Sequence, residues 1–168
     1  SYQARTGTSM KFSAQEEYGL RCLMTIASRD LGSGLTIPEI AKIESMTQPH
    51  VAKMLAILRK AEFIRSTRGQ YGGYMLARRP GEIIIGDVLA ELGGRMFEFG
   101  FCERHSGTSD ECVHLHDCSV RGLWTRIQSA VDAVVNRITL QDLLDGKMVD
   151  EPITLQPIAR RGSVASMP

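Results

Sequence analysis

Hydrophobic positions recur at helical spacing in three short stretches near the start of the chain, within residues 13–29, 37–43 and 47–61. A Ser or Thr stands at the start of each stretch or directly before it: Ser13, Thr36 and Thr47. After Ser13 and Thr36 a Glu follows three residues later, which is the capping-box spacing. Thr47-Gln48-Pro49-His50 is a third start of the same kind, with proline in the first turn. Two capped helices separated by a turn of a few residues predict a helix-turn-helix.

The stretch that follows has the pattern of a β-hairpin. Residues 63–67 and 73–77 are predicted strands, and the turn between them is rich in glycine and carries an arginine. A basic hairpin directly after a helix-turn-helix is the order of a winged-helix domain. Residues 86–92 then predict a short helix that ends at Gly93-Gly94.

A longer helix is predicted from about residue 120. Its apolar seam is spaced by 4, 3, 4, 3 and 4 positions and consists of Val120, Trp124, Ile127, Val131, Val134 and Ile138. A helix this apolar along one stripe has to bury it, on the first helix of its own domain, on a second copy of the chain, or on both. A long terminal helix in a chain of this size favours a homodimer. Thr139 and Asp142 have capping spacing and predict a last short helix that ends at Gly146.

The predicted fold class is mainly α with a small β-hairpin: a winged helix-turn-helix domain and a long C-terminal dimerisation helix. The expected divisions are an appended remnant before Met10 (1–9), a winged-helix DNA-binding domain (10–92), a cysteine-bearing loop (93–119), the dimerisation helix with the terminal short helix (120–146) and a flexible tail (147–168).

The composition is that of a globular chain, with 43% apolar and 23% charged residues among 168. No run of eighteen apolar residues and no signal-peptide pattern occurs, so we expect a cytoplasmic protein that does not enter a membrane. No Gly-rich phosphate loop, nucleophile elbow or pair of carboxylates in a catalytic frame is present, which argues against an enzyme.

The net charge of +1 conceals two opposed segments. Residues 47–79 hold seven Lys or Arg against one Glu, a net +6, whereas residues 80–118 hold eight acids against two Arg, a net −6. Basic charge concentrated on the predicted helix-turn-helix and hairpin favours binding to a polyanion.

Double-stranded DNA is the polyanion that this arrangement suits, with the helix from Thr47 in the major groove and the hairpin tip near the minor groove. Gln side chains suit adenine, and Lys and Arg side chains neutralise phosphates. The candidate DNA contacts are Thr47, Gln48, His50, Lys53, Arg59, Arg68, Gln70 and Tyr71. Each of these residues taken alone is equally consistent with the solvated face of an amphipathic helix or hairpin.

The segment FCERHSGTSDECVHLHDCSV concentrates possible metal ligands. Nine residues separate Cys102 from Cys112 and five separate Cys112 from Cys118, which is not the paired spacing of a zinc ribbon. In a reducing compartment three nearby thiolates suit zinc, copper(I) or an iron-sulfur cluster, while free thiols, one of them redox-active, are the alternative. Three histidines lie within this segment and are further possible ligands: His105, His114 and His116. Cys22 lies in an apolar helical stretch and is expected to be a buried hydrophobe.

Several motifs in order resemble the IscR/NsrR-type family of bacterial winged-helix transcription regulators. They are MKFS with EYGLRCLM (from Met10), TIPEIA (from Thr36), LRKAEFIRSTRGQYGGYMLA (from Leu58), and the three later cysteines followed by Leu-Trp. The resemblance covers about residues 10–144 and implies a homodimer that binds operator DNA. It also implies an iron-sulfur cluster, 2Fe-2S or 4Fe-4S, on Cys102, Cys112 and Cys118.

The resemblance leaves the fourth ligand to be assigned. Familiar cluster-bearing members have about five residues between the first two cysteines, where this chain has nine, and the position of one family's ligating histidine is Arg121, which keeps its charge and cannot ligate. Nitric-oxide-sensing members use a carboxylate from the first helix of the partner subunit, and the matching position is Glu17. The expectation is therefore a regulator whose operator binding responds to nitric oxide, redox state or iron and cluster supply; the alternative is a zinc-stabilised or thiol-switch module without a cluster.

Overall fold

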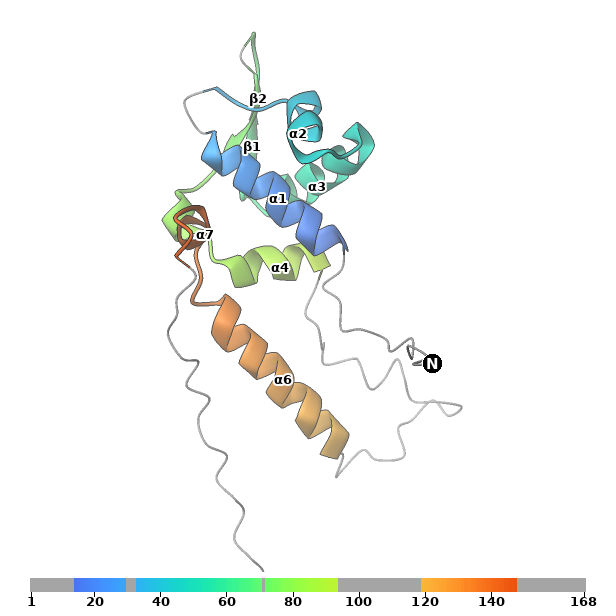
Figure 1. Cartoon of the computed structure of the whole chain (residues 1–168), viewed down its shortest axis with the longest axis vertical. Coiled ribbons are helices and arrows are strands. Elements are labelled where there is room, and N and C mark those ends of the chain that lie inside the picture. The colour runs from blue at the N-terminus through green and yellow to red at the C-terminus, as the bar shows by residue number, and fades with distance from the viewer. Residues whose placement is uncertain (1–13, 30–32, 71, 94–118, 148–168) are drawn as a thin grey trace, which may run out of the picture.

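The computed structural model describes residues 14–29, 33–70, 72–93 and 119–147, and it confirms a mainly helical chain with one antiparallel hairpin (Figure 1). The elements, in chain order, are α1 (Ala14–Ser28), α2 (Ile37–Glu44), α3 (Gln48–Lys60), β1 (Ile64–Thr67), β2 (Gly73–Leu76), the 3-10 turn η1 (Pro80–Glu82), α4 (Ile85–Gly93), α6 (Ser119–Val135) and α7 (Leu140–Leu144).

Two of the predicted helix caps are confirmed. Thr36 and Glu39 form a reciprocal capping box at the start of α2, and Thr139 and Asp142 form another at the start of α7. In both boxes the Thr hydroxyl accepts from a helix amide. The Thr hydroxyl and then the Thr backbone N–H donate to the carboxylate of Glu39 or Asp142, and these hydrogen bonds lower its pKa below the ordinary value. Ser13, the predicted cap of α1, lies outside the described residues.

The third cap was predicted to be of the same kind, and this was wrong. Thr47 is the N-cap of α3, but its side chain makes no capping hydrogen bond. The two helices differ at the third position: α2 has Glu39 there, whose carboxylate bonds back to Thr36, whereas α3 has His50, which has no carboxylate to reach back.

The two strands form the predicted wing, each one residue shorter than expected. Ile64 pairs with Leu76 and Thr67 with Gly73. A third segment joins this ribbon, since Leu35 and Tyr74 exchange backbone hydrogen bonds of 3.0 and 2.8 Å. The approach is close because Gly34 and Gly73 face each other there without side chains.

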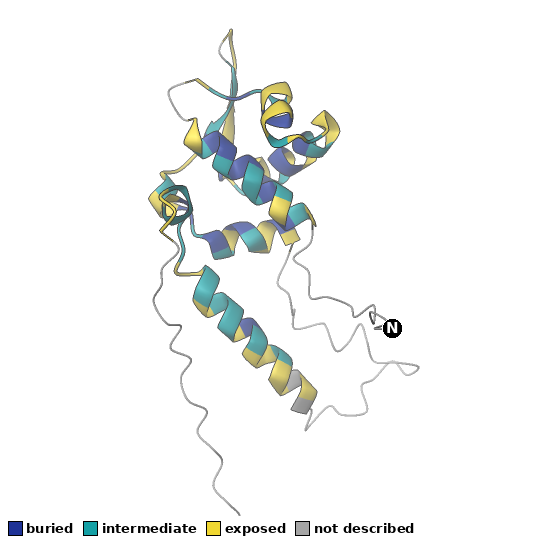
Figure 2. Cartoon of the chain, viewed as in Figure 1, coloured by how far each residue is buried: buried dark blue, intermediate teal, exposed yellow. Residues whose placement is uncertain are grey.

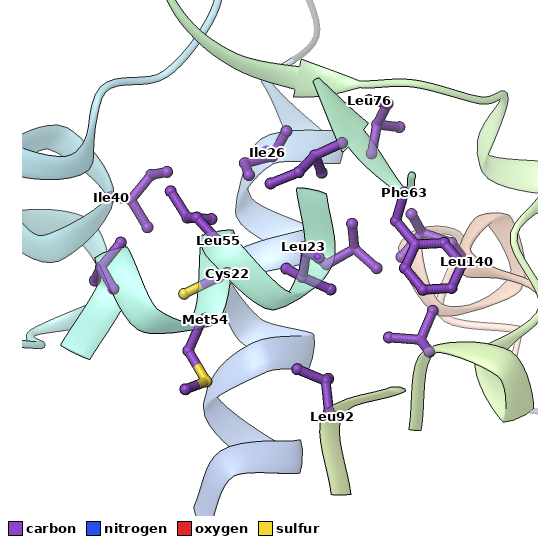
Figure 3. Packing of buried hydrophobic residues seen from close by; sticks show 14 of the residues in the cluster. Cys22, Leu23, Ile26, Ile40, Met54, Leu55, Phe63, Leu76, Leu92 and Leu140 are labelled. Carbon is purple, nitrogen blue, oxygen red and sulfur yellow. The ribbon is translucent and has the colours of Figure 1, made fainter. Parts of the chain in front are cut away.

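The core lies around α1, which contacts α2, α3, α4, α7 and β2 (Figure 3). The inner face of α3 supplies four fully buried residues at helical spacing: Val51, Met54, Leu55 and Leu58. Leu140 of α7 is also fully buried in this cluster, and Ile84 pairs with Thr139, so the chain returns to the core after α6.

Helix α6 extends away from this core and is intermediate or exposed along most of its length (Figure 2). It contacts α4 near its C-terminal end, where Val135 and Asn136 lie against Gly86. The predicted seam ran to Ile138, but the helix stops at Val135, and Ile138 packs on the core instead. Among the described residues, none of the helices has the length and apolar character needed to span a bilayer.

Candidate nucleic-acid interface

The outer face of α3 is polar and basic and carries no large apolar side chain. With Val51, Met54, Leu55 and Leu58 turned inward, the opposite face is exposed, and it comprises Gln48, Pro49, Lys53, Ala56, Arg59 and Lys60. Exposed Thr47 stands at the N-terminal end of this face. A helix with small residues and amide and basic side chains on its free face can lie close to base edges and phosphates.

The wing carries a second set of exposed polar groups. Its turn is closed by a hydrogen bond of 2.9 Å from the Gly72 amide to the Gly69 carbonyl, and Gly69 has a φ of 114°, which glycine adopts without strain. Arg68 and Gln70 are exposed on either side of this glycine, and Arg65 is exposed on β1. Tyr71, a predicted wing contact, lies outside the described residues.

Not every basic residue of the segment faces outward for binding. Arg78 donates hydrogen bonds of 3.1 and 3.2 Å to the carbonyls of Ala61 and Glu62, and its guanidinium lies 5.1 Å from the centre of the Phe63 ring. Arg78 therefore satisfies the C-terminal end of α3 and holds the start of the wing. Part of the +6 charge is structural.

The turn between α2 and α3 is fixed from α1. Arg21 donates to the Glu44 carboxylate at 2.8 Å and to the Glu44 carbonyl at 3.0 Å, and the Thr25 hydroxyl donates to the same carboxylate. Ser45 follows with a φ of 54°, in the left-handed region. These contacts fix the last residue of α2, just before the short turn that leads to α3.

His50 differs from the other predicted contacts of α3. Its side chain is half-buried and its ring meets the Tyr18 ring edge to face, with 4.7 Å between centroids and 77° between planes. Part of the imidazole surface is therefore covered by Tyr18.

The predicted metal ligands are described only in part. Cys102, Cys112 and Cys118 lie outside the described residues, as do the three loop histidines. Within the described part of the chain, no three His, Cys, Asp or Glu side chains gather as a metal site would require. Glu17 is exposed in the first turn of α1, while its neighbour Glu16 is buried.

The end of α4 meets the start of α1. The Gln15 side-chain amide donates to the Leu92 carbonyl, and the Glu16 carboxylate packs so closely on Gly93 that a methyl group there would overlap it. Gly93 is the last described residue before the cysteine-bearing segment, and it lies against the first turn of α1.

Cys22 is a core residue, as the sequence predicts. It is fully buried among apolar side chains. Burial first, and the nearby Glu44 carboxylate second, raise the pKa of its thiol to about 11, although Arg21 opposes the shift. The residue stays a neutral thiol near pH 7 and is not a ready ligand or nucleophile.

The sequence reading missed the network of Tyr18, Arg21 and Glu44. Tyr18 lies within the first predicted helical stretch, and its pairing with His50 depends on how α1 crosses α3. The exposed Pro49, Ala56 and Lys60 were also left out, although the predicted inner face of the helix implies their outward orientation.

Comparison with known proteins finds transcription regulators. Residues 12–146 match the profile of the Rrf2 family, described as an iron-dependent transcriptional regulator. The HTH-type transcriptional regulator NsrR of Geobacillus kaustophilus is 31% identical over 138 residues, covering 82% of this chain and 92% of that protein.

Solved structures agree as well. The structure of CymR, described as the global cysteine regulator of B. subtilis, is similar with a TM-score of 0.65 at 28% identity, covering 82% of this chain and 98% of that one. The structure of T. potens IscR has a TM-score of 0.66 at 26% identity, covering 82% and 88%.

Proposed function

Since this chain belongs to the Rrf2 family, and is therefore a DNA-binding transcription regulator and not an enzyme, we propose that an iron-sulfur cluster controls its binding to operator DNA. The signal would be nitric oxide, redox state or the supply of iron and clusters. One observation carries the proposal: residues 12–146 match a family described as an iron-dependent transcriptional regulator, and three closely spaced cysteines lie within that match.

The donor set fits such a cluster. Cys102, Cys112 and Cys118 would bind iron as soft thiolates, and Glu17, contributed by the partner subunit, would be the fourth ligand. Glu17 is exposed, so its carboxylate is free to bind iron held outside its own helix, which supports the assignment. When bound, the cluster would supply iron that reacts with oxygen or nitric oxide.

Operator contacts in this proposal come from both exposed elements. Gln48 bonds an adenine edge, Thr47 meets a base or phosphate, and Lys53 with Arg59 neutralises phosphates. Arg68, Gln70 and Tyr71 extend from the wing into the neighbouring groove. His50 contributes through the part of its ring that Tyr18 leaves open. The exposure of every described member except half-buried His50 supports the set.

The dimer would form along α6. Val120 and Leu123 are 54% and 50% exposed, and the apolar seam continues on the same helix toward α4. Pairing of two such helices would bury the seam and set the distance between two recognition helices, which must match half-sites about 34 Å apart. The chain would thereby convert a rearrangement of the cysteine segment into a change of that distance.

The test is anaerobic purification followed by iron, sulfide and zinc analysis and an absorption spectrum, for wild type, Cys112→Ala and the matched control Cys22→Ala. We expect iron and sulfide in wild type and in Cys22→Ala, and neither in Cys112→Ala. Stoichiometric zinc, or no metal in carefully anaerobic wild type, would contradict the proposal.

Glu17 is tested in the same way against an exposed acid of α4. We expect Glu17→Ala to shorten the lifetime of the cluster in air, because one ligand is lost, while Glu91→Ala leaves it unchanged. An unchanged lifetime and spectrum in Glu17→Ala would remove Glu17 from the ligand set.

A second candidate is a thiol-switch or zinc-stabilised regulator without a cluster. It is favoured by the structural similarity to CymR, the cysteine regulator, and by the nine-residue spacing between the first two cysteines. In that case the cysteines would respond to oxidants by disulfide or sulfenic acid formation, and DNA binding would change with thiol content and not with iron.

A further inference from the structure

Tyr18 contacts α3, the helix proposed to lie in the major groove, at the first turn of that helix. Its ring meets His50 edge to face at 4.7 Å, the separation and angle at which aromatic pairs attract. Both side chains are half-buried, so the contact lies at the margin of the core and not within it. Tyr18 is therefore placed to affect where α3 starts without carrying much of the packing.

Arg21 supports this ring from one turn further along α1. Its guanidinium lies 5.8 Å from the Tyr18 centroid, within cation–π range, and donates to Glu44 at 2.8 Å. Glu44 ends α2 and His50 lies in the first turn of α3. The two α1 side chains thus hold the turn of the helix-turn-helix from both of its ends.

The same turn of α1 is attached to α4. Gln15 and Glu16 contact Leu92 and Gly93, and Tyr18 follows only two residues after Glu16. A displacement of α1 at this point would move the end of α4 and the start of α3 together, because a helical turn is stiff.

We propose that Tyr18 is a positioning residue for operator recognition: its ring fixes His50 and so sets the orientation of α3 relative to α1. Tyr18 itself touches no DNA. The inference rests on DNA binding, which the family shows, and not on the presence of a cluster, so either can fail without the other.

The experiment measures binding of wild type, Tyr18→Leu and Tyr18→Phe to two duplexes. One duplex is selected from a random library by the wild-type protein and the other is of random sequence. All proteins are purified anaerobically and compared at matched iron content, over a range of salt concentrations. Thermal unfolding checks each variant, and Tyr18→Met, which has a flexible unbranched side chain without a ring, replaces Tyr18→Leu if that variant does not fold.

Loss of the ring contact should lower affinity for the selected duplex about tenfold, which corresponds to about 1.4 kcal/mol, with little change on the random duplex or in the salt slope. Tyr18→Phe keeps the ring and should bind as wild type does. An unchanged ratio of selected to random affinity in Tyr18→Leu would overturn the proposal. So would an equal loss on both duplexes, which marks a contact that does not depend on sequence, or a loss in Tyr18→Phe, which marks a hydroxyl contact.

Discussion

Cys22 illustrates how burial decides the chemistry of one residue. Its pKa of about 11 lies above the ordinary value of 9.0, so the folded protein keeps the thiol proton over a range in which the unfolded chain loses it. The stabilisation linked to that proton is full below about pH 9 and is lost as pH rises through 11. We expect the free energy of unfolding to fall over this range, and Cys22→Ala to remove that part of the slope.

The reactivity of the same thiol can be measured in a variant in which Cys102, Cys112 and Cys118 are replaced by Ser. At pH 8 an aromatic disulfide reagent should leave the native protein unlabelled and react with one thiol in denaturant, since Cys22 is buried and protonated. Rapid labelling of the native protein would show that the site opens freely.

The threonine caps provide a matched pair of residues. Thr36→Ala removes a capping box and should lower the free energy of unfolding by about 1 kcal/mol, measured by urea unfolding. Thr47→Ala removes no capping bond and should change stability much less, while it weakens binding to the selected duplex. Equal destabilisation by both would mean that the Thr47 hydroxyl caps α3 in solution.

The caps also show what the sequence can tell at this scale. The Thr36 and Thr139 boxes follow from residue types at fixed spacing, and both were predicted correctly. The error at Thr47 was avoidable, since the third position after it is His50 and not the Glu or Gln that a capping box requires. The pairing of Tyr18 with His50 was not accessible, because it depends on the crossing of two helices.

At the scale of the elements, the wing depends on one glycine. Gly73 has a φ of 156°, and a Cβ there would lie 2.7 Å from backbone atoms of Gly34 and Leu35, which cannot move aside. Gly73→Ala should therefore separate Leu35 from the hairpin, lowering the melting temperature and operator affinity together. Gly81→Ala, where a Cβ meets open space, is the control and should change neither. A wild-type melting temperature in Gly73→Ala would contradict this account.

Most helices were predictable because their buried faces repeat at about 3.6 residues, and the two strands because a glycine-rich turn separates them. The pairing of Leu35 with Tyr74, and of Ile84 with Thr139, was not, since each is an isolated bridge between segments far apart in sequence. The end of α6 at Val135 was missed for a related reason: Ile138 continues the apolar period but is buried by the core and not by the helix.

At the scale of the whole molecule, the proposed dimer depends on α6. Leu123 is half exposed in one chain, so Leu123→Glu should leave the monomer folded and disrupt pairing of the helices. Light scattering after size exclusion should give a dimer for wild type and a monomer for this variant. Ser129→Glu, an exposed position away from the seam, should remain dimeric. A dimeric Leu123→Glu would place the interface elsewhere.

The sequence allowed the winged helix to be predicted, because charge and periodicity are local properties, while the assignment of DNA contacts to α3 and the wing stays a prediction. The arrangement of Cys102, Cys112 and Cys118 lies outside the described residues and stays a prediction, as does the role of Glu17. What the described residues add is the junction of α1 and α4, where Gln15 and Glu16 contact Leu92 and Gly93.

The central claim is that a cluster on these cysteines controls operator binding, and its most direct test is the affinity for the selected duplex with and without metal. Anaerobic wild type, the same protein after chelation, and Cys112→Ala would be titrated by fluorescence anisotropy at one salt concentration. The account predicts that chelation changes the affinity of wild type about tenfold or more, and that Cys112→Ala binds as chelated wild type and does not respond. Equal affinities within about twofold for all three proteins would contradict it.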